Sequence, residues 1–145
     1  MRRLSILLLV GFAAGCGGDD SGTLSRQDYT KQANASCVEA EQELDALGGF
    51  ENFKELEREM KAGQKALEQS AGELRELQPP TQLAARHRKL VNLTERTAEL
   101  AGRLSAAAGK NDQLEMQTQA ERAEKLTQAA NEVSRQLGLE ECVAG

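Results

Sequence analysis

Four stretches of this sequence place apolar residues three and four positions apart, and this spacing restricts the fold more than any other feature. Such a period gathers the apolar side chains on one face of an α-helix. The stretches are separated by Gly48-Gly49, where left-handed backbone is easily adopted, by Pro79-Pro80, and by Gly109 to Asn111. We therefore predict four helices, at about residues 26–47, 50–78, 80–108 and 112–137.

The predicted helices are joined by short connections, which favour antiparallel neighbours in space. The sequence thus predicts an all-α domain over residues 25–145, an up-down-up-down four-helix bundle with coiled-coil-like packing. The aromatic share of 3%, the two prolines and the many helix-forming residues argue against a sandwich or a barrel. The main alternative is a three-helix bundle with a loose first segment. Many of the predicted core positions are alanine, so the core buries little area and we expect modest stability.

The charge balance restricts the partners of the chain. There are 18 Lys and Arg residues against 23 Asp and Glu residues, a formal net charge of −5. Nucleic-acid-binding proteins usually carry a basic face or stripe. No nucleic-acid partner is therefore expected.

The first sixteen residues form a pattern of their own. A basic start, with Arg2 and Arg3, is followed by an apolar run over residues 6–14. The run is too short to cross a bilayer as a helix, which takes about 20 apolar residues, but it fits the apolar region of a secretory signal. Small residues then precede Cys16, in the order Ala13-Ala14-Gly15-Cys16.

This segment resembles the lipobox of bacterial lipoproteins, although Ala13 stands where that pattern most often has Leu. The resemblance implies a signal peptide over residues 1–15 that is cleaved after Gly15, a thioether lipid on Cys16, and an acylated (for example palmitoylated) new amino terminus. It implies an extracytoplasmic protein held at the cell membrane by that lipid. Residues 16–24, rich in Gly, Ser and Asp, would be a flexible tether. The alternative is an ordinary signal peptide cut at the same site, with Cys16 as a plain thiol.

The remaining cysteines follow from this interpretation. With Cys16 acylated, Cys37 and Cys142 are left as one pair in an oxidising compartment, which favours a disulfide. A bridge across so long a loop would contribute at most about 4–5 kcal/mol in the chain-entropy account. Residues 138–142 would have to run back along the bundle to reach Cys37, a distance of about 16 Å that five extended residues just span. Free thiols or metal ligation are the alternatives; neither cysteine has a further Cys or His at ligand spacing, which disfavours a metal site.

The sequence offers little catalytic or cofactor chemistry. His87 is the only histidine, and we expect it half-buried at a helix start. A di-iron bundle needs Glu-x-x-His motifs, but Ala84 precedes His87 by three residues. His87 could pair with Met60 or Met116 as haem ligands, yet both methionines lie on apolar stripes, where core packing is the commoner role. No metal-binding, cofactor-binding or catalytic residues are therefore assigned.

Charged residues form two further groups of interest. The run from Arg86 to Lys89 spans a full turn, so we expect a solvated helix start, and the alternative is contact with an anionic membrane surface near the lipid. We expect several glutamates to lie on solvated faces rather than in a site: Glu55, Glu57, Glu59 and Glu124.

The lipobox and the helical content together resemble the small, mostly uncharacterised helical lipoproteins of high-GC (actinobacterial-type) bacteria. That family carries no chemistry to transfer, so Cys16 alone receives a role from it. We expect a non-enzymatic interaction or structural module of the cell envelope, which contacts an unknown envelope protein or a second copy through an exposed groove. The alternative is a carrier that binds a small ligand or cofactor in a cavity between the helices. The residues name no enzymatic reaction.

Overall fold

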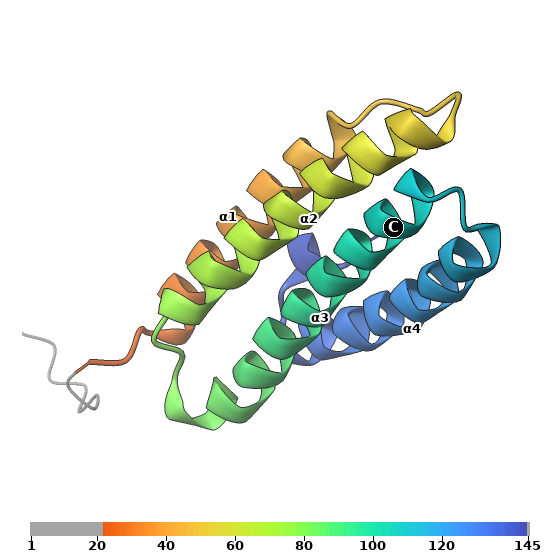
Figure 1. The fold of residues 1–145 in the computed structure, drawn as a ribbon. Helices are drawn as coiled ribbons and strands as arrows, with labels where there is room; N and C mark the ends of the chain where they lie inside the picture. The colour runs from red at the N-terminus through yellow and green to blue at the C-terminus, as the bar shows by residue number, and fades with distance from the viewer. Residues whose placement is uncertain (1–21, 145) are drawn as a thin grey trace, which may run out of the picture.

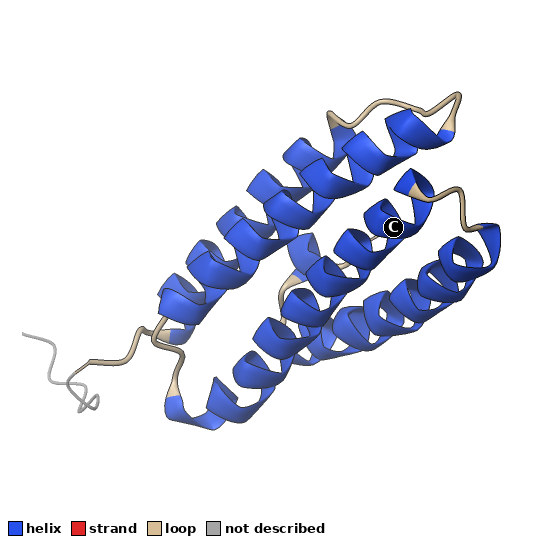
Figure 2. Cartoon of the chain, in the orientation of Figure 1, coloured by secondary structure: helices blue, strands red, loops and turns tan. Residues whose placement is uncertain are grey.

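The computed structural model describes residues 22–144, and this part of the chain contains helices and loops but no strand (Figure 2). Four long helices are joined in sequence, and two short 3-10 turns precede α3 and follow α4. Their bounds are α1 Arg26–Asp45, α2 Phe53–Glu76, η1 Thr81–Leu83, α3 Ala84–Gly109, α4 Gln113–Leu137 and η2 Glu140–Cys142. The predicted all-α fold is confirmed.

The helices form an antiparallel bundle that is closed on three sides and open on the fourth. Helix α2 packs broadly on α3, α3 on α4, and α1 on α2 (Figure 1). Helix α1 reaches the other half of the bundle mainly through η2, the short violet turn that lies between α1 and α4. The predicted four-helix bundle is therefore present, but its first and last helices are separated by the C-terminal segment.

The helix ends agree with the predictions where a side chain caps the first turn. Ser25 and Asp112 each accept a hydrogen bond, 3.1 Å long, from the backbone N–H three residues later. Helix α2 begins at Phe53 rather than at residue 50, because the Asn52 side chain caps it by accepting from Glu55 N–H at 3.0 Å. It ends at Glu76 because Leu77 is already extended ahead of the prolines.

The prediction that Gly48-Gly49 ends the first helix is wrong. Helix α1 ends at Asp45, and its last carbonyls accept from Ala46 N–H and Leu47 N–H, so no left-handed residue is needed there. Left-handed backbone is used instead at Gly138, whose φ is 74°. There the N–H groups of residues 138 and 139 close the end of α4, and the chain reverses.

Two separate groups of buried apolar side chains hold the bundle together, one at each end. The larger, which we call the disulfide-side core, consists of Tyr29, Ala33, Leu74, Leu83, Leu90, Val91, Leu93, Val133, Leu137 and Leu139. The smaller, which we call the loop-side core, consists of Leu56, Ala107, Ala108 and Met116, with Phe53, Met60 and Leu104 packed against them. The middle of the bundle between them is less completely filled.

The N-terminal predictions fall mostly outside the described residues. The signal segment, Cys16 and residues 17–21 of the predicted tether lie there. Leu24, which was expected to be flexible, donates its N–H to the Gln78 carbonyl at 2.7 Å and packs against the disulfide-side core. The predicted tether therefore ends before Leu24. Within residues 22–144 no helix is both long enough and apolar enough to cross a membrane.

Candidate functional site

A cleft of about 340 Å³ opens in the middle of the bundle, on the side where α1 and α4 are not packed together. All four helices and the C-terminal segment contribute to it. Its lining residues are Cys37, Ala40, Glu41, Leu44, Asp45, Leu67, Ser70, Leu74, Leu90, Thr94, Thr97, Thr127, Ala130, Asn131, Glu141, Cys142, Val143 and Ala144. We call this hollow the central cleft.

Burial of the lining residues increases from the rim of the central cleft to its floor. Leu74 and Leu90 at the floor are 1% and 3% exposed, and they belong to the disulfide-side core. The walls carry half-buried residues such as Ala40 and Ala130. The exposed residues of the lining include the acidic ones, so the cleft is apolar in depth and charged at its mouth.

The cleft exists because small and β-branched residues occupy positions where a leucine would fill the space. Thr94 and Thr97 of α3 face Ala130 of α4 across it. In addition, the buried residues of α1, Tyr29, Ala33 and Ser36, all lie before Cys37. The part of α1 that follows Ser36 has no buried residue and forms one wall of the cleft.

The polar groups of the walls can accept hydrogen bonds from a bound molecule. Thr94 donates its hydroxyl proton to the Leu90 carbonyl at 3.1 Å, and Thr97 donates to the Leu93 carbonyl at 2.9 Å. Because these protons are already used within α3, the hydroxyl oxygens offer lone pairs rather than donors.

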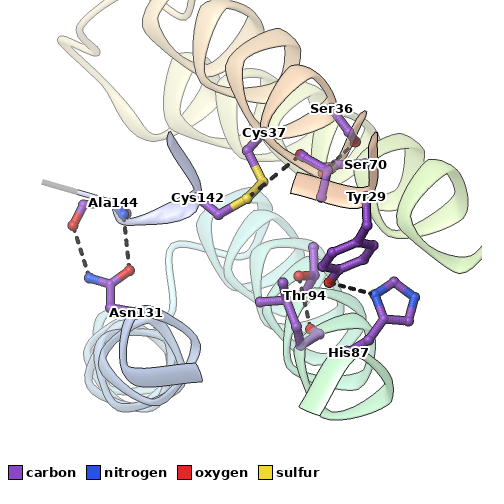
Figure 3. Close-up of a disulfide and its surroundings, with 11 residues drawn as sticks. Tyr29, Ser36, Cys37, Ser70, His87, Thr94, Asn131, Cys142 and Ala144 are labelled. Carbon is purple, nitrogen blue, oxygen red and sulfur yellow. Dashed lines mark hydrogen bonds between the residues drawn. A yellow bond between two sulfur atoms is a disulfide. The ribbon is translucent and has the colours of Figure 1, made fainter. Parts of the chain in front are cut away.

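A disulfide fixes the C-terminal wall of the cleft. It joins Cys37 in α1 to Cys142 in η2, with their Cα atoms 5.0 Å apart, and so supplies the single bridge expected from the sequence (Figure 3). Asn131 of α4 holds the same segment by exchanging two hydrogen bonds of 2.9 Å with the Ala144 backbone. The segment after Gly138 thus runs back along the bundle, as the sequence argument required.

His87 lies deeper than expected. It is 4% exposed, and the Tyr29 hydroxyl, itself fully buried, lies 3.1 Å from its Nδ1. The two rings meet edge to face, with their centroids 5.5 Å apart (Figure 3). Burial lowers the pKa of His87, while an interaction with the Leu74 backbone raises it and the nearby Arg88 lowers it. Burial also raises the pKa of Tyr29 to about 12.

These contacts define the role of His87. The Leu74 backbone interaction raises the pKa of His87, and only an acceptor, the Leu74 carbonyl, stabilises the protonated ring in this way. We therefore assign the ring N–H to that carbonyl, and Nδ1 then accepts from the Tyr29 hydroxyl. Both ring nitrogens are then engaged within the core. The pair stabilises the contact between α1 and α3 and offers no free acid or base to a ligand in the cleft.

The other candidates are separated by the fold. Met60 and Met116 belong to the loop-side core, whereas His87 is bound to Tyr29 of the disulfide-side core. The structure therefore does not bring His87 together with either methionine. Within residues 22–144 no group of three His, Cys, Asp or Glu side chains could hold a metal ion.

The charged candidates divide in a similar way. Glu59, expected on a solvated face, is only 8% exposed, so that prediction is wrong. Its carboxylate accepts hydrogen bonds from Arg58, from Nε at 3.0 Å and from Nη2 at 2.6 Å. Glu57 and Glu124 are exposed, and Glu55 is partly exposed beside the N-terminus of α2. Arg86, Arg88 and Lys89 are exposed around the first turns of α3, whereas His87 between them is buried.

A cavity between the helices was the alternative expected from the sequence, but the sequence did not indicate which segments would enclose it. No family model matches the chain, and searches of curated proteins and of solved structures also find no match. The function must therefore be inferred from the central cleft and its surroundings.

Proposed function

We propose that the protein is a non-enzymatic binding module of the cell envelope, and that a lipid on Cys16 holds it outside the cytoplasm. The resemblance of residues 13–16 to a lipobox supports the anchor, and a disulfide between Cys37 and Cys142 suits an oxidising compartment. A non-enzymatic role is supported by the position of His87, which contacts Tyr29 in the core and is not among the residues that line the cleft.

The central cleft carries the proposal that this module binds a small ligand. Its volume of about 340 Å³ falls within the range of about 300–1,000 Å³ that is usual for small-molecule sites. Its apolar floor and its threonine oxygens provide the combination such sites use, burial for affinity and a few polar groups for orientation. We propose that the module is a carrier for a small, largely apolar molecule.

Binding of a neutral apolar dye tests the carrier function. We expect Nile red to bind the purified bundle in a saturable way, with one dye per chain. Ala130→Phe fills the cleft from α4 and should weaken this binding about tenfold or more, because it removes the space the dye occupies. Gln128→Phe adds the same ring at an exposed position of α4 and should leave binding unchanged. Equal binding by both variants, at unchanged melting temperatures, would contradict a site in the cleft.

Intact mass of protein taken from native membranes tests the anchor. We expect a mass that lacks residues 1–15 and includes acyl chains, and we expect Cys16→Ser to abolish both the added mass and the partition into a detergent phase. An unlipidated wild-type chain that keeps residues 1–15 would contradict the proposal.

A second candidate function is contact with an envelope protein or with another copy of the chain. Two large apolar residues, Phe50 before α2 and Leu114 in the first turn of α4, are 56% and 77% exposed. The α1–α2 and α3–α4 loops lie at the same end of the bundle, which we call the loop end, opposite the end where the chain enters α1 (Figure 1). If they form a contact, the double change Phe50→Ser and Leu114→Ser should abolish self-association in sedimentation experiments or binding of the partner. An unchanged sedimentation profile of a self-associating wild type would contradict this use of the loop end.

A further inference from the structure

Among residues 22–144, the charged groups at the mouth of the central cleft are all acidic. The ionisable lining residues of this part of the chain are Glu41 and Asp45 of α1 and Glu141 of η2, without a Lys, Arg or His. All three carboxylates belong to exposed residues. Within residues 22–144 none of them forms an ion pair or accepts a side-chain hydrogen bond. The negative charge at this mouth is therefore not neutralised by the described part of the protein.

The acidic residues of α1 also lie where they reduce the stability of the helix. The last residues of α1 include Glu41, Glu43 and Asp45, and its last turn has no basic residue. The carbonyl end of a helix carries a partial negative charge, so carboxylates there are unfavourable. At the end of α4, by contrast, Arg135 lies in the last turn and complements the dipole. A positive group in the cleft would offset the unfavourable charge at the end of α1.

The apolar depth and the charged mouth together define one class of occupant. A chain of methylene groups would contact Ala40, Leu74 and Ala130, while the threonine oxygens of α3 and the three carboxylates would remain as acceptors above it. An anionic head group would meet only like charge, and a neutral one would leave the carboxylates without a partner. Charge complementarity therefore favours a cationic head group.

From this arrangement we infer that the central cleft binds cationic amphiphiles, molecules with an apolar body and a quaternary or primary ammonium group. The apolar body lies on the floor formed by α2 and α3, and the ammonium group lies among Glu41, Asp45 and Glu141. This inference rests on the proposed carrier function, because it assigns the ligand class of the same site. The hollow supplies the site, and the carboxylates select among the ligands that fit it.

Three ten-carbon probes that differ only in head group test the inference: decyltrimethylammonium, decanol and decanoate. Each is titrated against protein loaded with Nile red, below its critical micelle concentration, and displacement of the dye is measured. We expect decyltrimethylammonium to displace the dye at about tenfold lower concentration than decanol, with decanoate weakest. Because the mouth is open to solvent, this preference should shrink as salt is raised from about 10 mM to about 500 mM.

Two triple variants separate a local effect of the mouth from the overall negative charge. Glu41→Gln, Asp45→Asn and Glu141→Gln together should reduce the preference for decyltrimethylammonium over decanol to about twofold or less, while Nile red still binds. Glu39→Gln, Glu43→Gln and Glu140→Gln remove the same charge from the same two elements but not from the cleft lining, and should keep the preference.

Each outcome decides one of the two ideas. Equal displacement by the three probes on the wild type, or an equal loss of preference in both triple variants, would overturn the cationic ligand class. Failure of the wild type to bind either Nile red or decanol would instead overturn the carrier function itself.

Discussion

The two ends of this bundle are built differently: the disulfide end contains the disulfide-side core, and the loop end contains the loop-side core. At the disulfide end, leucines from α2, α3 and α4 surround a fully buried tyrosine, and Leu137 and Leu139 are 0% exposed. At the loop end, the buried group is small, contains two alanines, and is completed by half-buried side chains such as Phe53 and Met60. One end thus buries large side chains completely, and the other buries small ones or buries large ones in part.

This difference indicates where stability is concentrated and where movement is possible. Regions with few buried apolar contacts open at lower free energy than the rest of a domain. The central cleft lies between the two cores, with its floor at the disulfide end and its α1 wall extending toward the loop end. A ligand could therefore enter by small displacements of the loop end while the floor of the cleft stays fixed.

Removal of the disulfide should give one of the two largest effects. In the double variant Cys37→Ser and Cys142→Ser we expect the free energy of unfolding to fall by about 2–5 kcal/mol, because a cross-link between residues so far apart strongly restricts the unfolded chain. Urea denaturation measures the change. Dithiothreitol should destabilise the wild type and leave the double variant unaffected. If the wild type were equally stable with and without reductant, the bridge would not support the disulfide end.

Truncation of one side chain in each core tests the comparison directly. We expect Leu137→Ala to cost about 3–5 kcal/mol, since the side chain is completely buried among large neighbours, and Met116→Ala to cost about 2 kcal/mol, since it is at the edge of the smaller core. Thermal and urea unfolding of both variants give the two values. A larger loss for Met116→Ala would reverse the comparison.

Acid should destabilise the disulfide end through His87. Burial lowers the pKa of His87 in the folded protein below its usual value of 6.5, which the unfolded chain keeps. At pH values between the folded and the unfolded pKa, the unfolded chain therefore takes up a proton that the folded protein does not. The free energy of unfolding should therefore fall as the pH decreases below about 6.5, by at most about 1.4 kcal/mol per pH unit, and this loss should stop below the folded pKa. His87→Asn should remove this part of the pH dependence, and an unchanged profile in that variant would contradict the assignment.

Alkali should act on the partner of His87 with the opposite sign. Burial raises the pKa of Tyr29 from 10.0 to about 12, so the folded protein keeps a phenolic proton that the unfolded chain loses. Stability should decrease as the pH rises from about 10 to about 12. Tyr29→Phe should abolish this decrease and cost about 1–3 kcal/mol at neutral pH, because the ring nitrogen of His87 loses its buried partner. Denaturation curves at several pH values check both statements.

The smallest effect is expected at a helix cap of the loop end. Asp112→Ala removes the side chain that accepts from Glu115 N–H, and a lost N-cap costs about 1 kcal/mol. Ser25→Ala removes the matching cap at the other end and should cost about the same. Hydrogen exchange should nevertheless differ, with wider opening around residue 112 than around residue 25, because only Ser25 lies beside the larger core.

Local signals were sufficient for much of the fold. The spacing of apolar residues predicted four helices, and the reach required of a Cys37–Cys142 bridge predicted the return of residues 138–142 along the bundle. The end of α1 and the start of α2 were predicted at the wrong residues. The N–H groups of Ala46 and Leu47 close α1 at Asp45, and the Asn52 cap starts α2 at Phe53.

The site was harder to predict than the fold. The many alanines and threonines are compatible both with close helix packing and with a hollow, and sequence spacing does not distinguish the two. The deciding fact is that η2 lies between α1 and α4 and keeps them apart, which depends on the whole chain. The burial of His87 likewise depends on Tyr29 of α1, which folds against it from a distant part of the sequence.

The return of the C-terminal segment has a practical consequence for anyone who handles the protein. Val143 and Ala144 line the central cleft, and Ala144 is fastened to Asn131 on the flank of α4. A purification tag or reporter inserted directly after Ala144 would therefore begin beside the mouth of the cleft, in the middle of the described part of the molecule rather than at a tip. It would compete with any ligand for entry, so labels for binding work belong on an exposed residue of the loop between α1 and α2, such as Gly49.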